Sequence, residues 1–352
     1  MSLRRVLLAA YVAGVAALVF GAVAAPEKLR ASLLLAGFFP LSLSLGAGVF
    51  LAIDQVTGAR WSAGLRPLAI AMTRCYWPEA LALMAALAFG WTEFFGWIHA
   101  VGAHGHVAHS QQVWLAQGFF LARAAVYLAV WGVLLGRIRG QASAAVFLVV
   151  FGVTVSLAGF DWFMALEPGW VSTMFGVYIF SGLFLGALAA LAVGAVFLGR
   201  DGEPGLTDSQ LHDLGKLIFG FSMFWAYIWY CQYMLIWYTN IPEEITYFLR
   251  RHSGGWAVLS MTSVALNWLV PFCVLLPRWT KTDRKALLRV GLAVLAGHWL
   301  DLYIMTMPRF AGADPPIGVW EGLVFVGTLA AFGALVLRQL DRPREPARCG
   351  GT

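Results

Sequence analysis

Two carboxylates lie close together in an otherwise apolar part of the chain. The stretch GFDWFMALEPGWVSTMFG places Asp161 and Glu167 six residues apart among Phe, Trp and Met. An ionisable group inside a membrane span is costly unless it contacts water, a partner group or a transferred proton. Pro168 and Gly169 follow at once, so we expect Glu167 at the membrane interface, where it caps a helix or shapes a partner-binding rim. Asp161 lies deeper and is the stronger candidate for proton transfer.

Other ionisable residues fall within or at the ends of predicted spans. His298 and Asp301 are three residues apart, which places them on one helix face. The carboxylate could orient the imidazole, and such a pair can pass protons near neutral pH; alternatively, the two side chains form a static pair that locks helices together. Arg123 lies near the middle of a span and, if charged, needs an acid or carbonyl oxygens as partners. Glu93 and Asp161 have suitable depths, and the pair would be a structural ion pair or would tune the pKa of a buried carboxylate. The proton-transfer candidates are therefore Asp161, His298, Asp301, Glu93 and Arg123.

A dense aromatic segment, FSMFWAYIWYCQYMLIWYTNIPEE, follows later in the chain. Its Tyr, Cys and Met side chains repeat at helical spacing, which is typical of packing and of an interfacial aromatic belt. Alternatively, the Tyr hydroxyls and a Gln amide line an apolar slot for a quinone ring. The quinone-contact candidates are Tyr227, Gln232, Met234 and Tyr238; the partner-rim candidates are Glu167, Glu243 and Glu244.

Metal and haem sites are not expected within this chain. The segment HAVGAHGHVAH holds four histidines, His99, His104, His106 and His109, but no acid or Cys supports them locally. The four cysteines are scattered, with no CxxC or CxxCH pattern, which argues against covalent haem and iron–sulfur clusters. A b-type haem needs facing axial ligands, and only His298 lies clearly inside a span.

The elements that position these residues are membrane helices. The chain has 352 residues, of which 60% are hydrophobic and 12% charged, whereas soluble domains average about 25% charged residues. Long apolar runs favour helices of about 20 residues. We predict ten spans, at 5–25, 31–53, 76–99, 112–136, 143–164, 171–199, 214–238, 255–277, 286–307 and 316–340.

Basic residues in the loops predict the orientation. With both termini cytoplasmic, the inner side carries eighteen Lys and Arg residues and the outer side five. The net charge of +6 therefore reflects topology, and nucleic-acid binding is not expected. The first segment has the outline of a cleavable signal peptide, but its long apolar core favours retention as a span. The segment RDGEPGLTDSQLHDLGK forms the strongest internal boundary, with an N-cap expected at Thr207 or Asp208.

Three stretches together resemble a known family: LAGFDWFMALEPGWVSTMFGVYIFSG, LGKLIFGFSMFWAYIWYCQYMLIWYTNIPEE and GHWLDLYIMTMP. They are similar to NrfD/PsrC-type integral membrane subunits, most closely the F subunits of bacterial alternative complex III, a quinol:cytochrome c oxidoreductase. The resemblance implies two four-helix bundles flanked by two peripheral helices. The expected units are a peripheral helix at 1–30, bundles at 31–165 and 166–310, a last helix at 311–340 and a disordered cytoplasmic tail at 341–352.

The resemblance also implies a function. It places the chain in the bacterial inner membrane, within a quinol-oxidising complex of a respiratory or photosynthetic electron-transport chain. The implied partners are a multihaem cytochrome c, an iron–sulfur protein, a second NrfD-like subunit and small membrane subunits, which would hold haem c and iron–sulfur clusters. This chain would have no redox centre and would contribute quinone contact, proton transfer or both. The alternatives are an anchor of another NrfD-type complex, such as a polysulfide or nitrite reductase, and a stand-alone secondary transporter.

Overall fold

The computed structural model describes residues 3–24, 26–97, 109–167, 169–198, 206–311, 315 and 317–341. Within these residues all regular structure is helical and no strand occurs. The α-helices are α1 (Leu3–Ala24), α2 (Pro26–Thr57), α3 (Arg66–Thr73), α4 (Tyr76–Phe95), α6 (His109–Trp114), α7 (Gln117–Leu135), α8 (Gln141–Trp162), α9 (Phe175–Leu198), α10 (Asp208–Thr239), α11 (Pro242–Arg251), α12 (Gly254–Val264), α13 (Val270–Leu275), α14 (Arg284–Thr306) and α15 (Val319–Leu340). Short 3-10 helices occur at Trp61–Gly64, Met164–Leu166, Trp279–Lys281 and Met307–Arg309, and a π-helical turn at Ala265–Leu269.

Eight helical segments in the described part of the chain are long and apolar enough to cross a membrane. They are Arg4–Ala24, Lys28–Thr57, Gln117–Leu135, Gln141–Leu166, Phe175–Phe197, Gly254–Leu275, Arg284–Arg309 and Val319–Leu340. The helices α4 and α10 are also long, with 20 and 32 residues, but they contain more Trp, Tyr and charged or polar side chains. The chain is therefore an all-α, multi-pass membrane protein.

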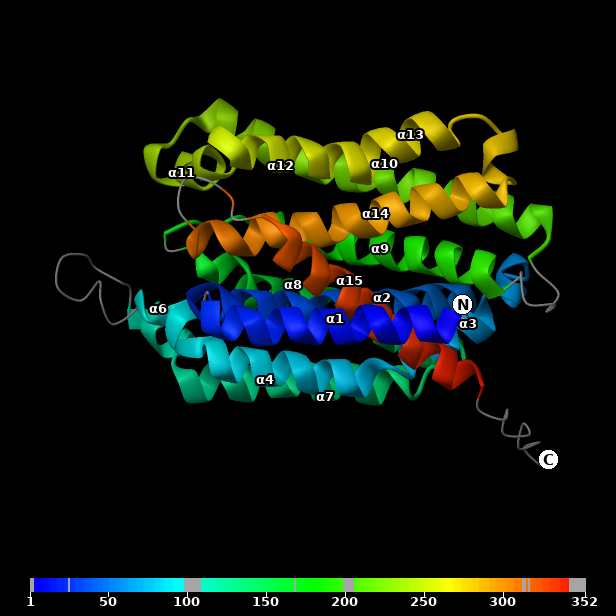
Figure 1. The fold of residues 1–352 in the computed structure, drawn as a ribbon, viewed down its shortest axis with the longest axis horizontal. Helices are drawn as coiled ribbons and strands as arrows, with labels where there is room; N and C mark the ends of the chain where they lie inside the picture. Colours follow the sequence, from blue (N-terminus) through cyan, green and yellow to red (C-terminus); the bar gives the residue numbers. More distant parts are fainter. Residues whose placement is uncertain are drawn as a thin grey trace.

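The helices pack as two groups that meet through α2 and α9 (Figure 1). In the first group, α2 contacts α4 and α8, and α7 contacts α4 and α8. In the second, α9 contacts α10 and α14, and α14 contacts α12 and α13. Both α2 and α9 are apolar on all sides, so they are largely buried. Gly46 permits their close approach, because a Cβ there would lie 2.4 Å from the Cβ of Ala187.

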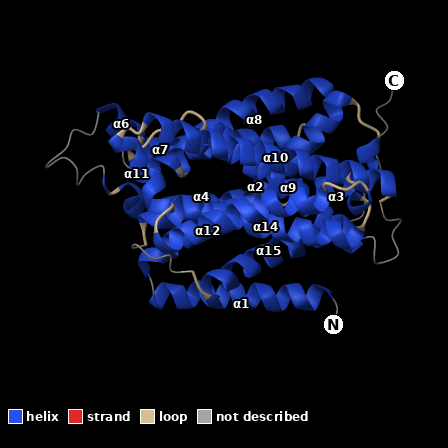
Figure 2. Cartoon of the chain, turned by 90° about the horizontal axis from the view of Figure 1, so that it is seen from above, coloured by secondary structure: helices blue, strands red, loops and turns tan. Residues whose placement is uncertain are grey.

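The first and last helices form a separate antiparallel pair. The contact between α1 and α15 is extensive, and Arg4 pairs with Asp341 at the start of one helix and the end of the other. Figure 2 shows α1 at one edge of the molecule, with α15 between it and the other helices. The start of α1 and the end of α15 lie at one end of the bundle, while α6 and α11 lie at the other (Figure 1). The predicted limits of the two bundles remain predictions, and the predicted tail lies outside the described residues apart from Asp341.

Several predicted boundaries are wrong for identifiable reasons. The span predicted at 112–136 is two helices, because the backbone is extended at Ala116 (ψ 131°) between α6 and α7. The loop predicted after residue 54 folds into a 3-10 turn and α3. The predicted N-cap is confirmed at Thr207, whose hydroxyl accepts from the Gln210 amide, so α10 begins before residue 214. The loop predicted after residue 238 contains α11, which Pro242 begins. The span predicted at 255–277 contains a π turn just before Pro271, whose ring nitrogen cannot donate a helix hydrogen bond.

Candidate functional site

Asp161 lies in the last turn of α8 and is fully surrounded by donors. Arg123 of α7 binds it with two hydrogen bonds, Nε to Oδ2 at 2.7 Å and Nη2 to Oδ1 at 2.9 Å. The indole N–H of Trp114 donates to Oδ1 at 2.7 Å, and the Tyr127 hydroxyl donates to Oδ2 at 3.3 Å. The predicted partnership of Arg123 with Asp161 is thus present. Only 2% of the Asp161 side chain is exposed, so this is a buried ion pair.

The break between α6 and α7 creates this arrangement. It turns Trp114 back over Arg123, whose guanidinium carbon lies 4.0 Å from the ring centroid. Arg123 also donates to the Trp114 carbonyl oxygen at 3.1 Å. A cation held against an aromatic face and a carboxylate has few other positions available to it. The cluster therefore holds Asp161 in one orientation.

Glu167 is a buried residue whose carboxylate binds two arginines, and its predicted role at a partner-binding rim stays a prediction. Arg250 donates to its Oε1 at 2.6 Å, and both terminal nitrogens of Arg251 lie 3.3 Å from Oε2. Arg251 also donates to the carbonyl oxygens of Ile304 and Met305 and lies over the Tyr247 ring. The carboxylate is buried because α11 covers it with these two arginines. Glu167 therefore fastens the turn after α8 to α11 and α14.

The other predicted rim residues are less informative. Glu244 is half-buried in α11, and the side chain of Glu243 lies outside the described residues. The histidines at 99, 104 and 106, and the side chain of His109, also lie outside them. In the part of the chain that the structure describes, no three His, Cys, Asp or Glu residues lie close enough together to hold a metal ion. The expectation about metals stays a prediction.

A cavity of about 280 Å³ lies beside Asp161 and Glu167. Its walls come from the segment just after α4, from α6, from the end of α8 and from the segment before α9, and they include four aromatic side chains, Trp97, Trp114, Phe160 and Trp170. Two of its lining residues, Trp97 and Trp170, have indole N–H groups with no hydrogen-bond partner in the described part of the chain. Trp170 is held flat against Tyr247, with ring centroids 3.7 Å apart. Aromatic walls, unpaired donors and nearby carboxylates suit a flat ligand whose oxygens accept hydrogen bonds.

Asp301 of α14 belongs to a second buried cluster. The Tyr178 hydroxyl donates to Oδ1 at 2.5 Å, and the Trp225 indole donates to Oδ2 at 3.3 Å. A small cavity of about 30 Å³ lies next to Asp301 and Tyr178 and is also lined by Arg251 and His252. A space of about 10–15 Å³ holds one water, so this cavity has room for one or two. Asp301 therefore has a short polar connection toward α11.

The predicted pairing of His298 with Asp301 is wrong. The Nε2 atom of His298 lies 2.9 Å from the Ser42 hydroxyl of α2, and its Nδ1 has no partner among the described residues. The two side chains share a face of α14, as predicted, but each reaches a different helix. Gly182 leaves room for the imidazole, because a Cβ there would lie 3.3 Å from His298 Nδ1 and 3.6 Å from Trp225 Nε1. The Trp225 indole, which donates to Asp301, therefore lies on the same side of Gly182 as the His298 ring.

The remaining candidates are Glu93, which forms a half-exposed ion pair, and the predicted quinone-contact residues of α10, most of which face outward. Glu93 pairs with Arg30 of α2 rather than with Arg123. The predicted quinone slot on α10 does not form as one site. Tyr227 and Tyr238 are 62% and 82% exposed on the outside of the bundle, with Met234 on the same side. Gln232 lies on another face of the helix, where it is buried and donates to the Ser172 hydroxyl at 3.1 Å, because residues five apart on a helix point in different directions.

The groups just outside the spans have altered acid–base properties. Burial raises the pKa of the Tyr247 hydroxyl to about 12, so it stays protonated at neutral pH. Burial lowers the pKa of His252, whose Nδ1 lies 3.0 Å from the Phe248 carbonyl oxygen. The neutral imidazole therefore donates from Nδ1, and its Nε2 has no partner in the described residues. This leaves a proton acceptor beside the small cavity next to Asp301.

Sequence reasoning missed three parts of this arrangement. The unpaired indoles of Trp97 and Trp170 could be known only from the packing. Arg251 had a signal, since paired arginines in a short amphipathic segment often cover a buried acid. Glu79 was also missed, because an acid in the first turn of a helix is ordinarily a solvated cap, yet here it is buried.

Comparison with protein-family profiles finds no family that matches this chain, and comparison with curated proteins finds no matching sequence. The functional interpretation therefore rests on the residues and on the geometry that the fold gives them.

Proposed function

We propose that this chain is an integral membrane subunit of a quinol-oxidising oxidoreductase complex, in which it contacts the quinone and carries protons away from it. The observation that carries the proposal is the cavity of about 280 Å³ beside Asp161 and Glu167. It combines aromatic walls with two unpaired indole donors, Trp97 and Trp170. The carbonyl oxygens of a quinone accept such hydrogen bonds, and its ring suits aromatic walls.

The carboxylate clusters support the proton-transfer part of the proposal. Oxidation of a quinol releases two protons along with two electrons, so acceptors must lie near the ring. Asp161 lines the cavity itself. Asp301 and the neutral His252 both line the cavity of about 30 Å³, which has room for water. These two residues form a second line of proton acceptors, which leads toward α11. Both lines lead to the same end of the bundle (Figure 1).

The distribution of basic residues supports an orientation for this end. The loops at the α6–α11 end carry the smaller share of Lys and Arg, five against eighteen. The helices α4 and α10, counted together with the eight candidate spans, make up the ten predicted spans. With ten spans and this distribution of basic residues, both termini are cytoplasmic and protons leave on the outer side. The membrane is the bacterial inner membrane. The division into two four-helix bundles with a peripheral pair follows the same proposal.

Partner chains complete the reaction. Electrons from the quinol need acceptors, for which the resemblance supports a multihaem cytochrome c and an iron–sulfur protein beside a second NrfD-like subunit. The direct test is affinity purification of this chain from its native membrane in mild detergent, with a visible spectrum and an assay of quinol-dependent cytochrome c reduction. Co-purified c-type haem with activity is the expected result. A colourless, monodisperse preparation of this chain alone would overturn the proposal and favour a transporter.

Two substitutions test the proton acceptors within an active complex. Asp161→Asn and Asp301→Asn are expected to lower quinol-driven proton release while the subunits remain assembled. Asp54→Asn is the matched control, because Asp54 is also a buried, paired carboxylate but lies at the other end, bound by Ser62 and Arg66. Unchanged proton release in both test variants would remove these carboxylates from the mechanism.

A further substitution tests the cavity as a quinone site. Trp170→Phe removes the indole N–H and keeps an aromatic ring, so the KM for quinol is expected to rise about two- to tenfold, the effect of one hydrogen bond. Trp279→Phe is the control, since Trp279 is 72% exposed at the opposite end. Equal KM values in the two variants would contradict a quinone in this cavity.

A further inference from the structure

A third cavity lies between the α1–α15 pair and the helices α2 and α4. Its volume is about 190 Å³, and its lining residues are almost entirely apolar, among them Val15, Leu18, Phe332 and Leu335. It shares no lining residue with the cavity beside Asp161. Two of the residues that line it from α1, Tyr11 and Val15, are 45% and 41% exposed, so the cavity reaches the lipid-facing surface of the molecule there. The cavity is therefore open to molecules dissolved in the bilayer.

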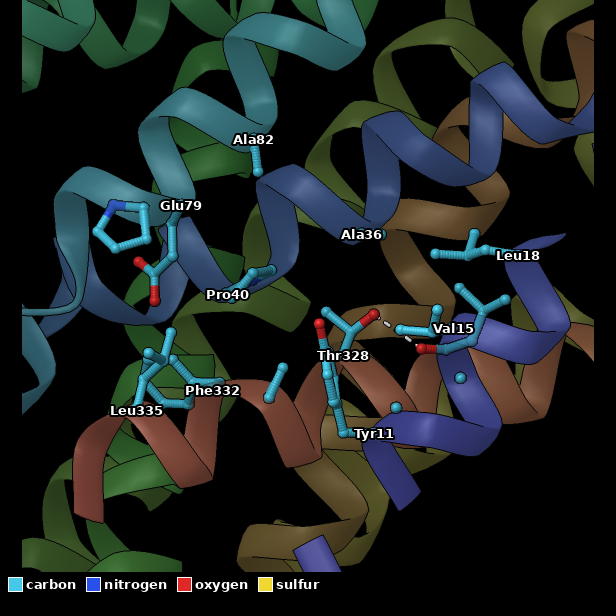
Figure 3. A pocket seen from close by; sticks show the side chains of 15 residues that line it. Tyr11, Val15, Leu18, Ala36, Pro40, Glu79, Ala82, Thr328, Phe332 and Leu335 are labelled. Atoms are coloured by element: carbon cyan, nitrogen blue, oxygen red, sulfur yellow. Dashed lines mark hydrogen bonds between the residues drawn. The ribbon is translucent and has the colours of Figure 1, made fainter. Parts of the chain in front are cut away.

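Glu79 is the polar feature that distinguishes this cavity from a packing defect. Its side chain reaches from α4 into the cavity, facing Phe332 and Leu335 of α15 (Figure 3). It is 4% exposed, and neither carboxyl oxygen has a hydrogen-bond partner in the described part of the chain. The Ser44 hydroxyl lies beside it but donates to the Met72 carbonyl oxygen at 2.9 Å. A buried carboxyl group with no partner is unfavourable, and a ligand that donates a hydrogen bond removes the penalty.

A second acceptor lies nearby because α2 contains Pro40. The proline nitrogen has no hydrogen, so the carbonyl oxygen of Ala36 loses the amide donor that a regular helix would supply. Ala36 and Pro40 both line the cavity. The hydroxyl of Thr328 is already used, since it donates to the Val324 carbonyl oxygen at 2.7 Å. Glu79 is thus an acceptor without a partner in the described residues, set among apolar walls, which suits a ligand that donates.

We propose that this cavity binds a quinol from the bilayer, with one ring hydroxyl donating to Glu79. The size is suitable, because an apolar cavity of about 150 Å³ holds a benzene ring. A quinol supplies the donor, the ring and a lipid-soluble tail, and the identity of the ligand rests on the proposed function. The step is binding alone, with no bond made or broken. The site lies near the start of α4, so it is separate from the cavity at the α6–α11 end.

Photolabelling tests the proposal on the purified complex. The probe is a quinol with a short alkyl tail and a benzophenone group, and mass spectrometry identifies the labelled peptides. Label is expected in α1, α4 and α15. Glu79→Leu is expected to weaken this labelling about tenfold or more, the effect of losing a strong hydrogen bond. Leu335→Trp, which fills the cavity and leaves Glu79 in place, is expected to weaken it similarly.

Thr328→Val is the matched control, because it changes a lining residue whose hydroxyl already has a partner. Labelling of α15 that is equal in the Thr328→Val, Glu79→Leu and Leu335→Trp variants would overturn the inference, as would label confined to peptides around Trp97 and Trp170. Quinol-dependent cytochrome c reduction is measured on the same preparation. An active complex without label in this cavity refutes the site alone, whereas a preparation without activity refutes the proposed function.

Discussion

The buried pair of Arg123 and Asp161 allows a quantitative prediction. Arg123→Met removes the cation and leaves Asp161, 2% exposed, with only the donors of Trp114 and Tyr127. Removing one partner of a buried ion pair costs about 3–5 kcal/mol, because the remaining charge stays out of water. Here the guanidinium supplies two hydrogen bonds to the carboxylate and one to the Trp114 carbonyl oxygen. We therefore expect the free energy of unfolding to fall by about 3–5 kcal/mol.

The complementary change should cost less, and the two should not add. Asp161→Asn keeps an oxygen that accepts from Trp114 and removes the charge, so we expect a loss of about 1–3 kcal/mol. In the double variant neither charge remains, and its loss should be smaller than the sum by about 1–3 kcal/mol. The assay is reversible unfolding in mixed micelles, followed by circular dichroism. Losses that add to within about 0.5 kcal/mol would refute the reasoning, since independent sites behave in that way.

Three further predictions concern the rest of the molecule. Arg251→Met should lower the free energy of unfolding by about 3–5 kcal/mol, because the Arg251 side chain is only 4% exposed. Arg250→Met should lower it by less than about 1 kcal/mol, because the Arg250 side chain is 44% exposed. Equal losses in the two variants would contradict this prediction. Burial lowers the pKa of His252, so the unfolded chain binds a proton first; stability should be full above the ordinary value of 6.5 and fall as the pH drops from there toward the folded pKa. His252→Gln should flatten that part of the stability profile, and an unchanged profile would exclude His252 as its source. Gly14→Leu should separate α1 from α15 in cross-linking experiments, because a Cβ at Gly14 would lie 2.5 Å from the facing glycine Cα, whereas Gly322→Leu meets nothing within 4 Å and should leave the cross-links intact.

The helical membrane fold could be predicted from the sequence, because only helices and closed barrels satisfy the backbone hydrogen bonds in lipid. Apolar runs of span length, basic loops and the N-cap at Thr207 each depend on local chemistry, and eight of the segments are long and apolar enough to cross. The breaks within the predicted spans were harder to predict from the sequence. The backbone is extended at Ala116, where the sequence has no proline and the nearest glycine, Gly118, lies two positions later. The helices α4 and α10 were both predicted as spans, at 76–99 and 214–238, although α10 begins earlier, at Asp208.

Side-chain partners could be predicted only where few candidate partners lie at the same depth in the membrane. Arg123 needed an acid at its own level, and Asp161 was one of two available. The spacing of His298 and Asp301 wrongly suggested a pair, because side chains on one helix face can contact different neighbouring helices. His298 lies next to the Ser42 hydroxyl. Asp301 accepts from the Tyr178 hydroxyl and the Trp225 indole. Glu79 was hidden by its position, since its burial depends on α1 and α15, which are distant in sequence.

The pairing of α1 with α15 has a consequence for how the protein is made. The partners Arg4 and Asp341 are separated by 337 positions, so the ribosome synthesises nearly the whole chain between them. During that time α1 must persist in the bilayer without its main partner, and its mean hydropathy of 2.4, the highest among the eight candidate spans, allows this. Its docking is then among the last events of assembly, because the two-stage insertion of helices precedes their association. Truncation before α15 would leave a first helix that is inserted and unpaired.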